Sequence, residues 1–244
     1  FTGNSGYTIL ADCHNIRDCW ITRNEATATL QSCTNISRCY IAENVSKDGV
    51  GGLQNCGLIE NCLIMDNGCA VAGALHDCSR ITLCTIVGNR ATHGVGGLSQ
   101  CREYIKDSIV WGNSPGQVEG GVTPEHCCIE GWTEGGMGNI AADPAFLMEE
   151  DFHLRPGSPC IDRAGGADVP DADYDGGVRS VDGGGDGHAV ADMGAYEFGQ
   201  ERPVLACSPR RIDLLARGGE AVQEHRILRL ANAGQGVLRW RLEA

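Results

Sequence analysis

Aromatic rings and basic side chains are both scarce in this chain of 244 residues. Phe, Trp and Tyr make up 5% of it, and 19 Lys and Arg stand against 32 Asp and Glu, which gives a formal charge of −13. Nucleic acids and anionic membranes are bound through basic surfaces, so this balance argues against both kinds of partner. No apolar run approaches the roughly 18 residues of a membrane span. We therefore expect neither nucleic-acid binding nor a membrane span.

Recognisable starting and catalytic motifs are also missing. The chain begins at Phe1 without an initiator Met or a signal-peptide pattern, so we expect it to start inside a longer protein. It contains no G-x-S-x-G, H-E-x-x-H or P-loop motif. Gly and Cys are abundant instead, with 35 and 14 residues. Few rings and many glycines favour a tightly wound backbone over an ordinary two-layer sandwich.

The abundant residues fall into a repeat. Cys recurs in two columns six residues apart, and successive units lie 20 to 23 residues apart. The unit reads L-x-x-C-x-x-I-x-x-C-x-I-x-x-N. The column residues are Cys13, Cys33, Cys56, Cys78 and Cys101, then Cys19, Cys39, Cys62 and Cys84, and then Asn24, Asn44, Asn67, Asn89 and Asn113.

A period of this length predicts one coil of a right-handed parallel β-helix per unit. Two-helix repeats need about 33 residues or more, and a leucine-rich horseshoe would carry more Leu per unit. Coils stack about 4.8 Å apart, so each column becomes a ladder of identical side chains. Small Cys with branched Ile and Leu would fill a narrow interior, and the Asn amides would hydrogen-bond along the stack. We predict an all-β fold with coils over residues 1–115.

These motifs resemble two related groups of proteins. Gly51-Gly52-Leu53 and Gly96-Gly97-Leu98, followed by apolar-x-x-Asn segments such as Ile64-x-x-Asn67, are similar to the repeats of polymorphic outer-membrane proteins. The unit as a whole resembles bacterial right-handed parallel β-helix repeat proteins. The resemblance covers roughly residues 1–115 and implies the fold. It leaves the function open, since such helices serve lyases, hydrolases, adhesins and inert stalks.

The Cys columns admit three interpretations. Stacked Cys have Cα atoms close enough for a disulfide, but parallel side chains in register rarely reach the dihedral angle near 90° that the bond needs. Sulfurs projecting into an apolar cylinder do not converge as a zinc site requires. We favour reduced, buried thiols that act as small apolar filler. Cys127, Cys128, Cys160 and Cys207 are expected outside the columns, where a disulfide would fit better.

The periodicity fades after Asn113, and a second resemblance begins. Segments 107–115, 129–132, 139–146, 151–162 and 192–198 follow one another as in the C-terminal region of bacterial choice-of-anchor Q β-helix proteins. In those proteins this region follows the helix, and an envelope-sorting signal lies further on. The resemblance therefore implies a secreted or cell-surface protein of the bacterial envelope. An exposed end of a β-helix is an unpaired edge, so we predict last coils and a cap over residues 116–199.

An Asp-rich loop lies within this second segment. Asp171, Asp173 and Asp175 alternate before a Gly, and Asp182 stands at the twelfth position of that frame. Calcium takes six to eight oxygens from flexible loops, and such a pattern can supply several of them. The alternative is an Asp/Gly turn whose carboxylates cap backbone amides. We name these four carboxylates as a candidate Ca²⁺ site.

The last segment, residues 200–244, contains the sequence pattern of alternating strands and an Asn-x-Gly turn. This pattern predicts part of an immunoglobulin-like β module, since about 40 residues are too few for the usual seven strands.

One outward column offers candidates for surface chemistry: Arg23, Glu43 and Asp66. A mixed-charge column is also what a solvated face needs to avoid like-charge repulsion, and we favour that interpretation and assign no catalytic residue. Our first hypothesis is a non-enzymatic secreted or cell-surface scaffold or adhesin that contacts a polysaccharide or a host or cell-surface glycan. The alternative is a polysaccharide lyase or glycoside hydrolase whose cleft lies partly on coils outside the given sequence. A third hypothesis is a structural spacer that carries another effector domain. A long groove lined by aromatics and carboxylates would favour the enzyme.

Overall fold

The chain winds into a parallel β-solenoid with an irregular segment along one side. A computed structural model describes residues 1–165, 169–200, 204–208 and 227–235. Strands and turns make up these residues, with no helix among them. The predicted all-β class and the parallel β-helix are confirmed. Within the described ranges nothing forms a helix long and apolar enough to span a membrane.

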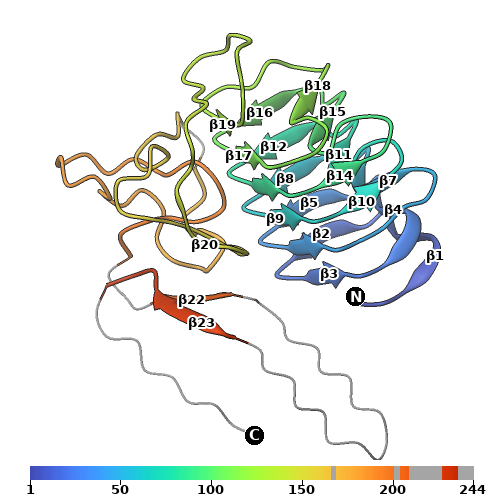
Figure 1. Cartoon of the computed structure of the whole chain (residues 1–244), viewed down its shortest axis with the longest axis horizontal. Helices are drawn as coiled ribbons and strands as arrows, with labels where there is room; N and C mark the ends of the chain where they lie inside the picture. Colours follow the sequence, from blue (N-terminus) through green and yellow to red (C-terminus); the bar gives the residue numbers. More distant parts are fainter. Residues whose placement is uncertain (166–168, 201–203, 209–226, 236–244) are drawn as a thin grey trace, which may run out of the picture.

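Each coil contributes strands to three parallel sheets (Figure 1). Sheet 1 contains β1 (Ser5–Ala11), β4 (Glu25–Gln31), β7 (Val50–Gln54), β11 (Leu75–His76), β15 (Leu98–Ser99) and β18 (Val118–Glu119). Sheet 2 contains β2 (His14–Arg17), β5 (Thr34–Ser37), β8 (Leu58–Glu60), β12 (Arg80–Thr82) and β16 (Tyr104–Lys106). Sheet 3 contains β3 (Trp20–Thr22), β6 (Tyr40–Ala42), β9 (Leu63–Met65), β13 (Thr85–Val87), β17 (Ile109–Trp111) and β19 (Cys128–Ile129). Several strands per coil exclude the leucine-rich horseshoe.

The register places the same repeat position of successive coils side by side. In sheet 3, Ile21 pairs with Ile41, which pairs with Ile64, and the column continues through Ile86 and Val110 to Ile129. Leu and Ile columns in sheets 1 and 2 align in the same way. These side chains and the Cys columns form one continuous buried core. Among the described residues, no aromatic side chain is a buried member of this core, in agreement with the scarcity of rings in the sequence.

Each coil turns three corners, and a residue with positive φ stands at nearly every one. We call them corner 1 (between sheets 1 and 2), corner 2 (between sheets 2 and 3) and corner 3 (after sheet 3). The residues are Asp12, Ser32, Asn55, Asp77 and Gln100 at corner 1, then Asp18, Arg38, Asn61, Leu83, Asp107 and His126 at corner 2, and Arg23, Glu43, Asp66, Gly88, Gly112 and Gly131 at corner 3. Asn, Asp and Gly adopt this conformation most readily, which accounts for their frequency there.

The Asn column follows corner 3 and forms a ladder. Nδ2 of Asn44 donates to Oδ1 of Asn67 at 2.9 Å, and Asn67 donates to Asn89 at the same distance. Each Oδ1 also accepts the backbone N–H of the Asn one coil earlier, as Asn67 does from Asn44 at 3.1 Å. The series starts at Asn4 and ends where Asn113 donates to Gln117 at 2.8 Å. The amides of these buried Asn residues are thereby satisfied without water.

The two Cys columns lie inside the cylinder as free thiols. Cys62 Sγ donates to the carbonyl of Glu60 at 3.2 Å and lies 3.7 Å from that of Ile36. Cys127 contacts the carbonyls of Glu125 and Ile105 at the same two distances. It continues the second column, in which Ser108 takes the place of Cys one coil earlier. The expectation that Cys127 lies outside the columns is wrong, because the last coil is shorter than the others and hides the spacing.

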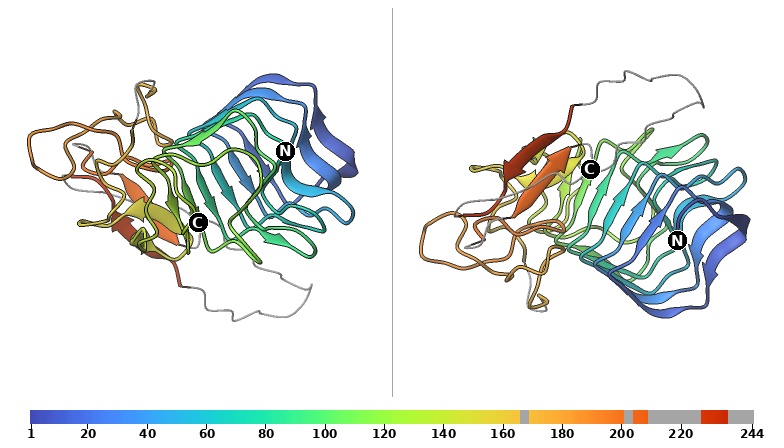
Figure 2. Two further views of the ribbon diagram at one scale, coloured as in Figure 1. Left: turned by 90° about the horizontal axis from the view of Figure 1, so that it is seen from above. Right: turned by 90° about the horizontal axis from the view of Figure 1, so that it is seen from below.

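Residues after the last coil return along the outside of the cylinder. Cys128 pairs with Ile140 in parallel, and Trp132 packs against the end of the core. Residues 141–165 and 169–200, which we call the cover segment, then lie beside sheet 3 and corner 2 (Figures 1 and 2). They include the antiparallel pair β20 (Phe146–Met148) and β21 (Asp151–Leu154). The segment in which we expected a cap therefore covers a side face as well as following the last coil.

The cover segment is attached to the solenoid by hydrogen bonds at corner 2 and on sheet 3. Buried Arg179 donates through Nη2 to Oδ1 of Asn61 at 2.6 Å and to the carbonyl of Ala195 at 2.7 Å. Ala195 N–H donates to Oγ1 of Thr85 at 2.9 Å. Gly165 N–H donates to Oδ1 of Asp107 at 2.7 Å. Three successive coils thus hold the cover segment.

Short strand pairs complete the described structure. β10 (Gly68–Cys69) pairs in parallel with β14 (Arg90–Ala91). β22 (Leu205–Ser208) pairs antiparallel with β23 (Arg229–Asn232). Most of the predicted immunoglobulin-like module, residues 209–226 and 236–244, lies outside the described residues, so that module stays a prediction.

Candidate functional site

A groove of about 610 Å³ lies between corner 3 of the middle coils and the cover segment. The solenoid contributes Met65 from β9, Val87 from β13 and Trp111 from β17 to its wall. The cover segment contributes Phe146 and Phe152 from the hairpin β20–β21. The groove is therefore built from residues almost 90 positions apart in the sequence.

A change in the corner 3 column makes room for the groove. In the first coils this column carries long side chains, and Arg23 forms an ion pair with Glu43 at 2.7 Å. Asp66 follows, and then the column loses its side chains at Gly88 and Gly112. A Cβ atom at Gly88 would lie 2.6 Å from Oδ1 of Asp66. Gly88 thus leaves space for the carboxylate of the preceding coil, and both glycines have a positive φ that suits them.

Aromatic and apolar side chains form the walls. Phe146 and Phe152 meet edge to face, with ring centroids 5.0 Å apart and planes at 83°. Trp111 is half-buried and packs against Met65 and Val87, together with both Phe rings. Partly exposed aromatic rings beside polar groups are typical of surfaces that stack against flat, amphipathic ligands.

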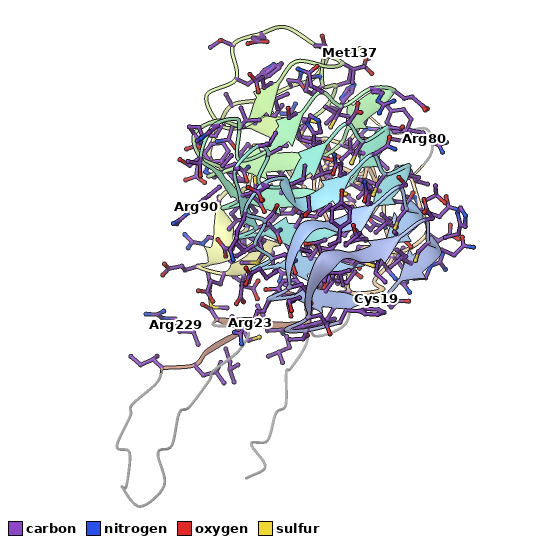
Figure 3. All side chains as sticks on the ribbon, turned by 90° about the vertical axis from the view of Figure 1, so that its right-hand side faces the viewer. Cys19, Arg23, Arg80, Arg90, Met137 and Arg229 are labelled. Carbon is purple, nitrogen blue, oxygen red and sulfur yellow. The ribbon has the colours of Figure 1, made fainter. Side chains whose placement is uncertain are left out.

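Charged groups surround these walls. Asp66, Asp143, Glu149 and Glu150 are the carboxylates, and Arg90 and Arg155 are the guanidinium groups. Partial desolvation, followed by the negative charge of Glu150, raises the pKa of Asp66 above its usual range, although this side chain still reaches solvent. Figure 3 shows Arg90 projecting from the side of the solenoid opposite to Arg80. The groove therefore combines a hydrophobic wall with carboxylates that can accept hydrogen bonds or protons and guanidinium groups that can donate hydrogen bonds.

Of the three outward candidates from the sequence, one lies in the groove. Asp66 lines it, whereas Arg23 and Glu43 pair with each other in the coils before it. The aromatic wall escaped sequence analysis because Trp111, Phe146 and Phe152 meet only when the cover segment folds back. The break in the column at Gly88 and Gly112 is a signal in the sequence that could have pointed to an opening.

Three of the four Asp residues of the candidate calcium site make side-chain contacts that are separate from one another. Asp173 accepts the N–H groups of Gly177 at 2.7 Å and Glu197 at 3.0 Å. Asp175 contacts His153 at 2.8 Å, and Asp182 accepts N–H groups of its own loop, from Gly185 to Gly187. Asp171 is exposed. No group of three or more His, Cys, Asp or Glu within the described ranges is arranged to hold a metal ion. Calcium binding at Asp171, Asp173, Asp175 and Asp182 stays a prediction.

A buried group of charges stabilises the cover segment from within. His153 lies between Asp151, at 2.6 Å from Nδ1, and Asp175. Desolvation opposes the charged imidazole, but the hydrogen bonds and charges of the two carboxylates outweigh it and raise the pKa of His153 to about 9. The second oxygen of Asp151 accepts the N–H of Cys207 at 2.7 Å. Asp151 therefore connects His153 of the cover segment to β22.

A second buried pair lies beside Arg179. Asp192 accepts N–H groups of Asp162 and Phe198, at 2.8 and 2.6 Å, and Glu197 accepts those of Asp192 and Val181. Burial raises the pKa of both carboxyl groups, and the charge of Glu197 adds to the effect at Asp192. These groups are enclosed by protein, so we assign them to stability and not to a site.

No family model, no curated protein and no solved structure matches this chain.

Proposed function

We propose that the protein is a secreted or cell-surface β-helix scaffold that binds a saccharide in the groove between corner 3 and the cover segment. The observation that carries the proposal is the combination of Trp111, Phe146 and Phe152 with accessible carboxylates in one groove. Sugar rings have apolar faces and hydroxyl rims, and this combination matches both. The resemblance of residues 107–199 to choice-of-anchor Q proteins supports a place on the bacterial envelope.

A glycoside hydrolase is the second candidate, because a groove lined by aromatics and carboxylates is the feature expected of the enzyme. Asp66, with its raised pKa, suits a general acid. Hydrolysis also needs a second carboxylate fixed at a set distance across the glycosidic bond. Glu149 and Glu150 stand in the exposed turn of the β20–β21 hairpin, which is a poor support for such precision. We therefore place binding before hydrolysis.

A polysaccharide panel scored for retention and for release of reducing ends tests both candidates. We expect retention of at least one polysaccharide without release. The variant Trp111→Ala should lose retention, and Trp20→Ala is the matched control, since Trp20 is an exposed Trp on the same face of sheet 3 outside the groove. Release that disappears in Asp66→Asn would favour the hydrolase. Equal retention by the two Trp variants would refute binding in the groove.

A further inference from the structure

Two buried cysteines outside the core columns lie at the interface between the solenoid and the cover segment. Cys128 of β19 pairs with Ile109, so it belongs to the outer column of sheet 3, which runs back through Thr85 and Leu63. Cys160 belongs to the cover segment. Both residues are buried in the same cluster of side chains and carry free thiols in this structure. Two thiols from separate elements therefore share one enclosed space.

The two thiols interact directly. The interaction with the thiol of Cys128 is the largest cause that raises the pKa of Cys160, and burial is the next. The backbone is held at both residues. Cys128 N–H donates to the carbonyl of Ser108 at 2.9 Å, and the carbonyl of Cys160 accepts the N–H of Met193 at 3.0 Å. The folded chain thus keeps the two sulfurs near each other before any bond forms between them.

The core columns differ from this pair in their geometry. Their cysteines recur at the same place in every coil, and each makes the same contact with the carbonyl two residues before it, as Cys62, Cys84 and Cys127 do. Parallel side chains of this kind rarely reach the dihedral angle that a disulfide needs. Cys128 and Cys160 come from different elements, so no common register fixes their side chains parallel to each other.

We infer that Cys128 and Cys160 form a disulfide, and that it joins the cover segment to the last coil, when the chain folds with a disulfide oxidant such as oxidised glutathione. The thiolate of one Cys attacks the oxidant, which releases one glutathione and leaves a mixed disulfide. The second Cys attacks the mixed disulfide and releases the other glutathione. The two protein thiols thereby lose two electrons and two protons, and the oxidant gains them as it becomes two thiols.

Refolding of the whole chain in a glutathione buffer tests the inference. Because the folded protein encloses both thiols, the reduced chain is unfolded in urea and diluted into mildly alkaline buffer with oxidised and reduced glutathione. The remaining thiols are alkylated in denaturant and counted by mass spectrometry. We expect two fewer thiols than the 14 of the reduced chain. An unchanged count, glutathione adducts on Cys128 or Cys160 instead of a bridge, or a bridge between column cysteines would overturn the inference.

Peptide mapping identifies the two partners. Cleavage after Glu, Lys and Arg should release residues 126–130 joined to residues 151–163, and fragmentation of this product distinguishes Cys127 from Cys128 without any variant. Cys128→Ser and Cys160→Ser should each abolish the loss of thiols. The matched control, Cys127→Ser, should keep the bridge, since Ser108 already occupies the equivalent place one coil earlier. A bridge that maps to Cys127 would overturn the assignment.

Limited proteolysis measures the effect of the bridge on the cover segment. The oxidised protein should be cleaved there at least severalfold more slowly than the reduced protein, because the bond ties this segment to β19. Cys128→Ser, refolded in the same buffer, should be cleaved as fast as the reduced protein. Equal rates for the oxidised and reduced wild-type protein would overturn the inference that the bond joins the cover segment to the last coil.

Discussion

The solenoid and the cover segment are stabilised in opposite ways. In the solenoid, each coil repeats the contacts of the last: Ile on Ile, Asn on Asn, and thiols that donate to carbonyls. In the cover segment the important contacts occur once, as at Arg179 with Asn61 or His153 with two Asp residues. Repetition spreads the effect of a change over neighbouring coils. When a buried charge occurs only once, no equivalent neighbouring contact shares the effect of a change at that residue.

Corner 2 shows the difference within a single column. In the second coil, Arg38 pairs at the surface with Asp18 of the first coil, at 2.7 and 2.8 Å. In the third coil the place is taken by Asn61, whose side chain receives Arg179 and donates to the carbonyl of Ala172 at 2.8 Å. One backbone position thus serves a solvated ion pair in one coil and a buried attachment in the next.

Replacing Arg179 should give the largest effect. In Arg179→Met, Glu197 and Asn61 lose their buried donor, which costs about 3–5 kcal/mol. We expect the cover segment to become sensitive to limited proteolysis while the circular dichroism of the solenoid persists. Arg38→Met is the matched control and should cost about 1 kcal/mol or less, because its ion pair is exposed. Equal losses in the two variants would show that the two regions are not stabilised differently.

Removing one rung of the Asn ladder should come next. Asn67 donates to Asn89 and to the carbonyl of Ile41, and it accepts two hydrogen bonds from Asn44. Asn67→Ala leaves these buried groups without partners, so we expect a loss on the order of 3 kcal/mol in urea unfolding. Asn35→Ala should cost about 1 kcal/mol, since Asn35 is exposed, its side chain donates a hydrogen bond to Asn15, and Ala would have to keep the positive φ of this position. A cost at Asn67 no greater than at Asn35 would contradict a stabilising ladder.

Alkaline pH should weaken the cover segment before the solenoid. The pKa of His153 is raised to about 9 from the 6.5 of a free imidazole, so its contribution is complete below pH 6.5 and is lost as the pH rises towards 9. The slope from one such group is at most about 1.4 kcal/mol per pH unit. The raised pKa values of Asp192 and Glu197 act in the same direction.

Amide hydrogen exchange in the cover segment between pH 6.5 and 9 measures this loss of stability. The rise with pH of the exchange rate of an unprotected amide is first subtracted. His153→Gln should flatten the dependence, and His93→Gln, at an exposed position on the solenoid, should leave it unchanged. A solenoid that opens first with rising pH would reverse the expected order.

Thiol labelling of the native protein tests the smallest expected difference, because it measures which thiols are accessible and alters none of the contacts described above. Burial is the largest cause that raises the pKa of Cys62, Cys101 and Cys127, so these thiols stay protonated and unreactive. In the native protein we expect labelling only at the four half-buried thiols, Cys13, Cys19, Cys69 and Cys207. All 14 should react after unfolding without reductant, and fewer would indicate disulfides.

The solenoid could be predicted from the sequence because each of its contacts joins equivalent positions of neighbouring units. Leu10 pairs with Leu30, and the spacing of the two residues already says so. The groove could not be predicted, because no repeat relates Trp111 to Phe146 or Asp66 to Glu150. Only the folding back of the cover segment brings them together, and its attachment through Arg179 depends on side-chain packing that has no periodic signature. Asp66 was found because it belongs to both systems, as a column position and as part of the groove.

Outward side chains of the corner 3 column can change without altering the buried core of the solenoid. Its side chains point away from the cylinder, while the Asn that follows each of them turns inward to the ladder. A residue exchanged at position 43 or 66 alters the outside of one coil and leaves the interior beneath it intact, whereas Gly88 is restricted by its positive φ and by the carboxylate of Asp66. A new recognition surface can therefore arise one coil at a time, by mutation of a residue whose side chain is not part of the buried core.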